Sequence, residues 1–315
     1  MSRKLKFDLN VQADALLCPN PQEFYSKAYI TEDVVNNYRT LPGVKYKTKV
    51  ANVLFVDILH PSACTFTTDN SPLDAVEIDV CAISAMAEIC RFDLEQSFVS
   101  LQMVKGSNGD FTVPSFMAYY WDEMAKEIQD EIAQLRWSGD TSLSPTNFLS
   151  LCDGYIVKFC DPTSGISAAA GNGIYNGVLT SVNILTEMVG VYAALPGKVR
   201  ANKTNLRFYL SSDAAQLYEL AAASGNTQTY VTAPLALTFL GVQIVVCDGM
   251  PASTMVLTDY RNLIYAFDGE GDTTALKAIN LEDTVAEPLL RTRANLKVGF
   301  FFVNPSEIIV YNICY

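Results

Sequence analysis

Residues 114–139 read PSFMAYYWDEMAKEIQDEIAQLRWSG, and this stretch decides the class of the fold. Ser115, which follows Pro114, is a candidate N-cap, and Gly139 is a candidate helix stop. Between them the apolar side chains recur every three or four positions, as they do on one face of an α-helix: Met117, Tyr120, Trp121, Met124, Ile128, Ile132 and Leu135. The spacing predicts one helix over residues 115–137, about 35 Å long.

The opposite face of this predicted helix is acidic. It carries five carboxylates, namely Asp122, Glu123, Glu127, Asp130 and Glu131. Lys126 is the basic residue among them and is placed to pair with Asp122 four positions earlier. Glu127 and Glu131 are also four apart, and their like charges repel each other. The helix therefore presents an acidic surface to its surroundings.

A hairpin is predicted on the N-terminal side of the helix. Residues 44–51 (VKYKTKVA) alternate strictly, which is typical of a strand with one apolar face, and Lys45, Lys47 and Lys49 share the polar face. Residues 76–80 (VEIDV) alternate again after a loop-like stretch. The layout indicates an extended hairpin that leads back to a sheet. Three lysines on one face also suit a solvated edge strand, because lysine discourages pairing between edges.

Residues 1–43 lack a sustained apolar period, although short helices are predicted at Pro21–Lys27 and Thr31–Tyr38. We expect an arm that contributes to assembly rather than to folding. Residues 1–50 hold eight Lys/Arg against five Asp/Glu, and the remainder holds 14 against 29, which gives the net charge of −12. An acidic body argues against tight nucleic-acid binding. The basic segment suggests packing against other copies, and a solvated tail would have the same composition.

The sequence after residue 150 predicts a mixture of strands and helices without a regular βα alternation, which is typical of an α+β fold. Strands are expected at 155–159, 206–210, 241–247, 254–257 and 262–267. Helices are expected at 178–194 and at 212–223. Residues 297–303 and 307–312 are expected to form a closing hairpin around Asn304, Pro305 and Ser306.

Residues that carry enzyme chemistry are sparse. His60 is the single histidine, so a Ser-His or Cys-His site would have to use it. The eight cysteines contain no C-x-x-C pair, which argues against zinc and favours free thiols. The glycine run at 171–177 is one residue too long for a dinucleotide fingerprint, and the acidic run at 268–272 lacks the later ligands of a calcium loop. We expect no catalytic residue, cofactor or metal.

Nothing near the N-terminus resembles a secretory signal, and no apolar stretch is long enough to span a membrane, so we expect a chain that is made and kept in a cytoplasm.

The order of these parts resembles that of the major capsid protein of tailed bacteriophages, which has the Hong Kong 97-like fold. The likeness is to capsid proteins of phages of Bacteroidetes-type hosts. There a segment E-I-C-x-x-D-L-E-Q-S/T-F, present here as Glu88–Phe98, precedes a helix that ends in W-x-G, present here as Trp137–Gly139. The resemblance covers essentially the whole chain.

The resemblance implies a division of the chain into five parts. These are an N-terminal arm at 1–43, an E-loop at 44–76, a peripheral domain at 77–164 with the spine helix at 115–137, an axial domain at 165–275, and a return to the peripheral domain with C-terminal strands at 276–315. It also implies assembly in the host cytoplasm into hexamers and pentamers of an icosahedral head around double-stranded DNA. Portal and scaffolding proteins of the phage would be its partners, and decoration proteins could join them. Because no charged helical leader follows Met1, we expect a fused scaffolding domain to be absent or already removed.

In this fold the E-loop lies across the peripheral domain of the adjacent subunit. We therefore expect Lys45, Lys47 and Lys49 to meet the acidic helix face of a neighbour, formed by Asp122, Glu123, Glu127, Asp130 and Glu131. Two alternatives remain at this point. One is an encapsulin-like compartment with the same fold, and the other is a hydrolase that uses a cysteine with His60.

Overall fold

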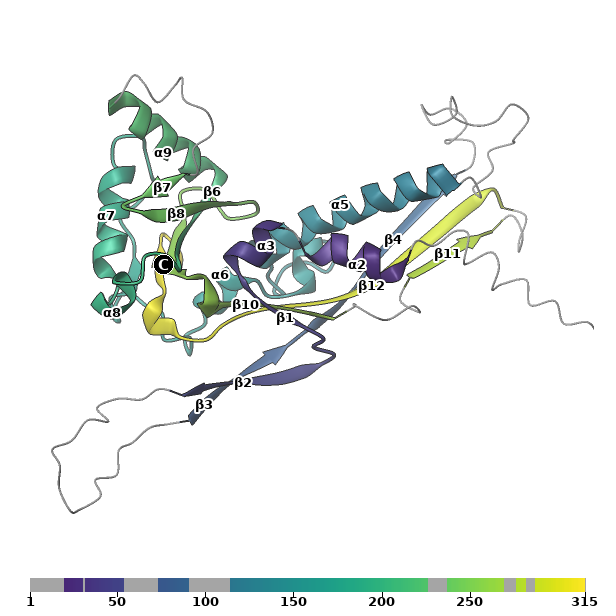
Figure 1. The fold of residues 1–315 in the computed structure, drawn as a ribbon, viewed down its shortest axis with the longest axis horizontal. Helices are drawn as coiled ribbons and strands as arrows, with labels where there is room; N and C mark the ends of the chain where they lie inside the picture. The colour runs from purple at the N-terminus through teal and green to yellow at the C-terminus, as the bar shows by residue number, and fades with distance from the viewer. Residues whose placement is uncertain are drawn as a thin grey trace, which may run out of the picture. The chain divides into compact units, whose positions relative to one another are not determined.

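The computed structural model describes residues 20–30, 32–53, 73–90, 114–225, 237–268, 276–281 and 287–314 (Figure 1). The chain divides into two compact units. Unit 1 comprises Met1–Asn36, Ala82–Ala133 and Phe267–Val298, and unit 2 comprises Asn37–Cys81, Gln134–Ala266 and Gly299–Tyr315. Helices and strands are mixed in both, as the sequence predicts for an α+β fold.

Unit 1 is built from helices packed on a sheet in which buried and exposed side chains alternate along the strands. Its elements are α2 (Pro21–Tyr29), α3 (Glu32–Asn37), α5 (Pro114–Ser138), β4 (Cys81–Cys90), β11 (Leu276–Asn280) and β12 (Leu289–Phe302), and the ends of α3, α5, β4 and β12 continue into unit 2. Strand β12 pairs antiparallel with β11 and also pairs with β4. Its residues Leu290, Thr292, Ala294, Leu296 and Val298 are buried, whereas the residues between them point away from the core.

The long helix forms as predicted, with bounds that differ from the prediction by one residue at each end. Met117, Trp121, Ile128, Ile132 and Leu135 are buried on one face. The hydroxyl groups of Tyr120 and Thr292 lie 2.6 Å apart, which ties this helix to strand β12. Gly139 follows the last helical residue, and it has to be glycine because a Cβ there would lie 2.2 Å from the Cys152 carbonyl oxygen.

Helix α2 belongs to the core of unit 1, which corrects the expectation that the N-terminal segment serves assembly alone. Phe24, Tyr25 and Tyr29 are buried, and the Phe24 ring meets the Trp121 ring edge-on at 5.3 Å. The Tyr29 hydroxyl donates to the Asp268 carbonyl oxygen and accepts from the Lys297 amide, at 2.9 Å each. The nine-residue helix is too short to show a period in the sequence. Residues 1–19 lie outside the described part of the chain.

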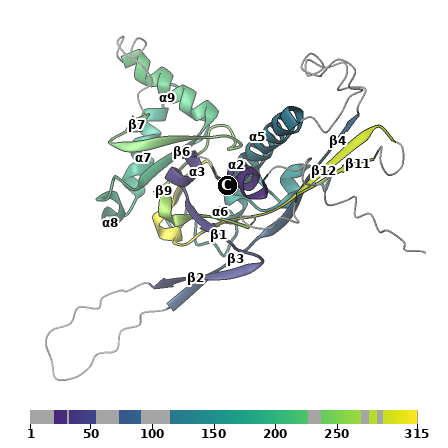
Figure 2. The same cartoon turned by 45° about the vertical axis from the view of Figure 1, so that its right-hand side comes forward.

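The larger part of unit 2 is a six-stranded sheet covered by helices (Figure 2). The strand order is β5-β13-β9-β6-β8-β7, with bounds Gly173–Ile174, Ile309–Tyr311, Met255–Asp259, Leu206–Ser211, Val242–Cys247 and Thr238–Phe239. Helices α7 (Ile184–Ala194) and α9 (Ser212–Gly225) pack on one face of it, and α8 spans Gly197–Arg200. Strand β6 pairs in parallel with β8 and antiparallel with β9, so it is buried on both faces.

The opposite face of this sheet meets an aromatic cluster. Tyr209 of β6 packs against Tyr38 and Trp137 at 5.5 Å from each, and Trp137 packs against Tyr155 at 5.3 Å. Tyr155 in turn contacts Phe300 at 5.8 Å. All five side chains are at most 2% exposed. This cluster joins segments of unit 2 that are far apart in the sequence.

The remaining elements of unit 2 form the predicted hairpin and its base. Strands β2 (Lys47–Val53) and β3 (Leu73–Asp79) pair antiparallel, with Thr48 opposite Ile78 and Val50 opposite Val76. This confirms the stem of the predicted hairpin, and residues 54–72 lie outside the described part. At its base a small apolar cluster includes Val44, Ile78, Val80, Ile264 and Ala266. Strand β1 (Arg39–Pro42) pairs with β10 (Leu263–Asp268) nearby.

Two predicted elements after residue 150 are wrong, namely a strand and the closing hairpin, and one predicted helix begins later than expected. Residues 155–159, predicted as a strand, form a helix, α6 (Tyr155–Phe159). The prediction failed because a five-residue apolar run does not distinguish a helix from a strand. Helix α7 begins at Ile184 rather than near residue 178. Thr180 and Asn183 exchange side-chain-to-backbone hydrogen bonds of 2.7 and 3.3 Å, and these hold a turn in front of the helix.

The closing hairpin does not form. Strands β12 and β13 belong to different sheets, and β13 pairs with β9 and β5 instead. The side-chain oxygen of Asn262 accepts from the amides of Val303 and Asn304 at 3.0 and 2.7 Å, which fixes the chain where it leaves β12. A 3₁₀ turn at Pro305–Glu307 follows and directs the chain into the second sheet. Two further 3₁₀ turns lie at Phe148–Leu151 and Tyr260–Asn262.

The cysteines correct a second expectation, that of eight free thiols. Cys81 and Cys152 form a disulfide with a Cα–Cα distance of 5.8 Å, and Cys160 and Cys314 form another at 4.8 Å. Cys90 and Cys247 are not in disulfides, and Cys18 and Cys64 lie outside the described residues. Pairs separated by 71 and 154 residues cannot be recognised from local spacing.

The burial of α2 predicts that its aromatic residues stabilise the fold. Phe24→Ala should lower the free energy of unfolding by about 3–5 kcal/mol, because it removes a buried ring that packs on Trp121. Val35→Ala, at a half-exposed position on α3, is the matched control and should change stability little. Urea unfolding of both variants is the measurement. Equal stabilities of wild type and Phe24→Ala would contradict a role of α2 in the core and favour a role in assembly alone.

A buried lysine predicts a pH dependence of stability. Burial lowers the pKa of Lys158 from 10.5 to about 8, and this outweighs the attraction of Asp153 and Asp79. The unfolded chain therefore holds this proton up to a higher pH than the folded chain, so the contribution to stability rises as pH increases from about 8 to 10.5. Below that window the cost of burying the charge is fully present.

Lys158→Met should therefore stabilise the protein at pH 7 by roughly 2–3 kcal/mol, since one pKa unit corresponds to about 1.4 kcal/mol. Part of this gain is offset by loss of the ammonium contact with the Phe301 ring, whose centroid lies 3.2 Å away. The difference in unfolding free energy between wild type and variant, followed from pH 7 to 10, should shrink. A difference that stays constant across this range would contradict the assignment.

Candidate subunit-contact surfaces

The hairpin stem carries its charges on one exposed face. Lys47 Nζ lies 2.9 Å from Glu77 Oε1 and 3.3 Å from Asp79 Oδ2, both on the paired strand β3. The hydrogen bond that Lys47 donates to Glu77 lowers the pKa of Glu77, and the bonds that Lys47 donates to Glu77 and Asp79 raise the pKa of Lys47. Lys49 stands opposite Glu77 in the strand register. The hairpin thus supplies two carboxylates for Lys47, which sequence alternation alone does not show.

The predicted apolar face of this strand is only partly correct. Val44 is buried and Val50 packs against the same small cluster, but Tyr46 is 71% exposed. Strand β2 begins only at Lys47, and Tyr46 sits in a bend where its carbonyl oxygen accepts from the Val80 amide at 3.1 Å. The alternation is therefore broken before the regular strand starts. Lys45 lies on the same irregular stretch and is exposed.

The acidic face of α5 divides into two parts. At its N-terminal end, Asp122 lies 3.2 Å from Lys27 of α2 and 3.3 Å from Lys126, and Glu123 lies 2.6 Å from Lys126. The hydrogen bond from Lys27 is the first cause of a lowered pKa of Asp122. Lys27 was outside the predicted site because nothing in the sequence relates residue 27 to residue 122.

The second part of the acidic face has no such neutralisation. No ion pair joins Glu127, Asp130 or Glu131 to another described residue, and all three are exposed. Burial, followed by the charge of Glu127, raises the pKa of Glu131. The repulsion predicted for this pair is therefore present. Of the eight predicted contact residues, five form no ion pair with another residue in the described part of the chain: Lys45, Lys49, Glu127, Asp130 and Glu131.

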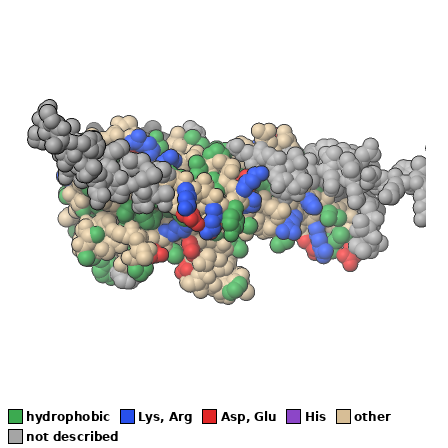
Figure 3. Space-filling view, turned by 90° about the horizontal axis from the view of Figure 1, so that it is seen from below, with side chains coloured by type: hydrophobic (Ala, Val, Ile, Leu, Met, Phe, Trp, Pro, Cys, Tyr) green, Lys and Arg blue, Asp and Glu red, His purple; other side chains and the backbone are tan. Residues whose placement is uncertain are grey.

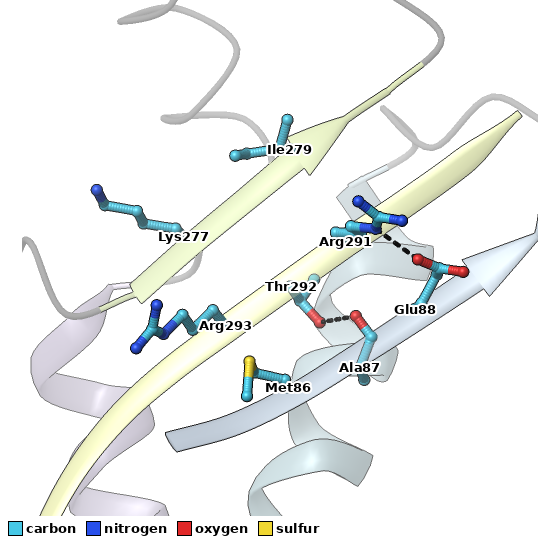
Figure 4. A pocket seen from close by; sticks show the side chains of 8 residues that line it. All are labelled: Met86, Ala87, Glu88, Lys277, Ile279, Arg291, Thr292 and Arg293. Carbon is cyan, nitrogen blue, oxygen red and sulfur yellow. Dashed lines mark hydrogen bonds and ion pairs between the residues drawn. The ribbon is translucent and has the colours of Figure 1, made fainter. Parts of the chain in front are cut away.

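A groove of about 470 Å³ lies on the outward face of the sheet in unit 1 (Figure 4). Arg291 Nε donates to Glu88 Oε2 at 2.5 Å across strands β12 and β4. Met86 is 70% exposed and Ile279 is 47% exposed, so the groove combines charged and apolar side chains. It is lined by Met86, Ala87, Glu88, Lys277, Ile279, Arg291, Thr292 and Arg293. Glu88 is the first residue of the segment that carries the sequence resemblance.

A further surface, which sequence reasoning missed, is the outer face of α7 in unit 2. Ile184, Met188 and Val191 are buried, but Leu185 and Val189 on the other side of the helix are exposed. Val182, in the turn before the helix, is 88% exposed. The helix reads ILTEMVGVYAA, and this near absence of polar residues on either face is the signal that could have identified it.

Features that would support an enzyme are missing from the described ranges. No group of three or more His, Cys, Asp or Glu side chains there could hold a metal ion. His60 lies outside those ranges, and four of the cysteines are in disulfides. No described helix combines the length and the apolar character needed to cross a membrane. On the face drawn in Figure 3, basic and acidic side chains lie in small groups rather than in one continuous basic area.

No family model and no curated protein matches the sequence. The fold, however, matches solved capsid structures over nearly its whole length. The capsid of a native GTA particle is 16% identical, with 99% of this chain and 100% of that chain covered and a TM-score of 0.56. The satellite phage P4 procapsid is 10% identical, with 99% and 92% covered and a TM-score of 0.60.

The structure from Mycobacterium phage Adephagia is 11% identical, with 96% of each chain covered and a TM-score of 0.53. Identities this low establish the fold and leave the function to be argued separately. The agreement extends across both units, because the covered share of this chain is so high. The chain therefore has the Hong Kong 97-like fold of phage capsid proteins.

Proposed function

We propose that this chain is a major capsid protein, which assembles with copies of itself into the hexamers and pentamers of an icosahedral phage head. The likeness to capsids over 99% of the chain supports this role, which is structural rather than enzymatic. The single observation that carries it is the outer face of α7, which one chain leaves exposed although it is apolar.

The outer face of α7 has the composition of a buried surface. Leu185, Val189, Ala193 and Ala194 are exposed on it, together with Thr186 as a small polar member, and Glu187 lies at its side, where it accepts from the Asn176 side-chain amide nitrogen at 2.8 Å. A helix that is apolar all round is normally buried. Covering a valine or leucine side chain contributes about 1.5–3 kcal/mol. A second copy that covers this face would remove the apolar surface from water.

Gly190 supports the same interpretation. It lies within α7 on the exposed side, where an added Cβ would meet nothing within 4 Å. Glycine inside a helix costs about 1 kcal/mol relative to alanine, and nothing in the single chain requires it here. A closely approaching neighbour would supply the requirement. Identical contacts repeated around a rotation axis close into a ring, which is how one surface can build both hexamers and pentamers.

The other parts of the molecule suit the same role. We assign residues 44–76 as the E-loop, because the hairpin stem β2–β3 forms a two-stranded sheet of its own. The sheet with α7 and α9 would form the axial domain, and α5 the spine helix. The net charge of −12 suits a shell that encloses DNA without gripping it, since like charges repel. Portal, scaffolding and decoration proteins would be partners, with assembly in the host cytoplasm and the virion as the final location.

The assembly role predicts the effect of charge on α7. Val182→Glu together with Val189→Glu should abolish assembly, because two carboxylates would be buried at each contact, and it should leave the melting temperature of the single chain unchanged. Ser212→Glu with Gln216→Glu adds the same charge to the exposed side of α9 and is the matched control. Sedimentation velocity of each purified variant measures the particle population. Normal particles from the α7 variant would refute a contact at this face.

The charged surfaces predict a second contribution to assembly, one that depends on salt concentration. We propose that Lys45 and Lys49 of one copy meet Glu127, Asp130 and Glu131 of a neighbour, since no ion pair joins any of these five to another described residue. Each exposed pair contributes only about 0–1 kcal/mol, but the contact recurs throughout a shell. Lys45→Glu with Lys49→Glu should weaken assembly most at low salt, because the Debye length shortens to about 3 Å at 1 M.

Charge reversal of Glu127 and Glu131 to lysine should partly restore assembly of that variant. Lys47→Glu is the control, because it places a third carboxylate beside Glu77 and Asp79 and should act on the hairpin of its own chain. The yield of particles against salt concentration is the measurement. Unchanged assembly of the Lys45/Lys49 variant at low salt would favour the edge-protection role of the lysines.

A further inference from the structure

Two disulfides lie in unit 2, and the proposed shell function makes no use of either. The first joins Cys81 to Cys152. Strand β3 of the hairpin ends at Asp79 and strand β4 begins at Cys81, so this bond is attached two residues beyond the hairpin stem. Cys152 is 1% exposed and follows the 3₁₀ turn at Phe148–Leu151. The bond therefore ties the chain at the base of the hairpin to the segment that follows α5.

The second disulfide lies elsewhere in unit 2 and is accessible. Cys160 is the C-cap of α6, and Cys314 follows strand β13 at the end of the described chain. Both residues are exposed. This bond ties the C-terminal segment to α6 and makes no connection to the hairpin. The two bonds thus restrain different segments, which provides an internal comparison.

The hairpin depends on its base for a fixed position in unit 2. Its two strands form a sheet without a third strand among the described residues, and an isolated two-stranded hairpin is marginally stable in water. The contacts that hold it at the base are the Val80–Tyr46 backbone hydrogen bond and the small cluster with Ile78, Ile264 and Ala266. Ile78 and Val80, which make these contacts, precede Cys81 by three residues and by one residue.

We propose that Cys81 and Cys152 form an oxidation-dependent clamp on the base of the hairpin. In a reducing cytoplasm both pairs are dithiols, and the base is held only by the noncovalent contacts. Outside the cell, a small-molecule disulfide oxidises each pair. One protein thiolate attacks that disulfide and releases a small thiol, and the second thiolate displaces the other small thiol from the mixed disulfide.

In this exchange the protein pair loses two electrons and two protons, and the small disulfide is reduced to two thiols. A chain that meets oxidant after folding would then hold the base of the hairpin more tightly than the newly made chain does. Because a thiol or disulfide must be reached to exchange, the exposed Cys160–Cys314 bond should form and break before the Cys81–Cys152 bond.

The first test is peptide mapping by mass spectrometry of the full chain under non-reducing conditions, after treatment with oxidised glutathione. Two linked peptide pairs are expected, 81 with 152 and 160 with 314, and dithiothreitol without denaturant should open the second pair first. Alkylatable thiols at Cys81 and Cys152 after oxidation would overturn the proposal.

The second test is amide hydrogen exchange of residues 76–81 and 305–313. Cys81→Ser with Cys152→Ser should lose protection at 76–81 and keep it at 305–313. The matched variant, Cys160→Ser with Cys314→Ser, should show the reverse. If either variant fails to fold, wild-type protein compared before and after reduction should show the same losses. Equal exchange of the hairpin base in oxidised and reduced wild type would overturn the clamp.

Discussion

The packing of Trp137, Tyr155 and Tyr209 against one another is the interaction on which unit 2 depends. These rings come from the end of α5, from α6 and from β6, and each is at most 1% exposed. Trp137 Nε1 donates to the Tyr38 hydroxyl at 3.2 Å, and the Tyr155 hydroxyl donates to the Ile264 carbonyl oxygen at 2.9 Å. The indole nitrogen of Trp137 and the hydroxyl of Tyr155 are therefore hydrogen-bonded, as burial requires.

A buried cation completes this cluster. The guanidinium of Arg136 lies 4.6 Å from the Tyr38 ring centroid and 5.1 Å from that of Tyr265. Aromatic faces stabilise a desolvated cation, so Arg136 is held without a carboxylate among the contacts described here. The backbone on either side is equally constrained, because Gly139 and Gly154 have backbone carbonyl oxygens within 2.7 Å of where a Cβ would stand. The W-x-G motif thus has a physical basis in this cluster.

The sequence predicted the parts of the fold whose pattern is long and local. The seven apolar positions of α5 give a helix correct to one residue at each end, and the alternation at 76–80 gives the inward and outward residues of β3. The conformations of residues 155–159 and 303–306 could not be predicted from local patterns. Tertiary contacts determine them, such as the hydrogen bonds that Asn262 accepts from Val303 and Asn304. The disulfides and the Lys27–Asp122 pair were out of reach for the same reason, since both join distant segments.

The candidate contact surfaces show the same division. Charged faces are visible in a sequence, but whether a charge is already paired is not, and three of the eight predicted residues prove to be paired within the chain. The outer face of α7 and Gly190 were missed because a helix that is apolar all round does not show which side its own chain covers. The structure therefore adds what the sequence does not show, namely which apolar and charged side chains remain exposed in the single chain.

The central claim is that these exposed surfaces are covered by other copies of the same chain. Electron microscopy of the purified full-length protein in negative stain tests it most directly. We expect closed, roughly isometric particles, or the six-fold and five-fold rings from which such particles are built. A chain that remains strictly monomeric at high concentration, even with its scaffolding and portal proteins supplied, would contradict it.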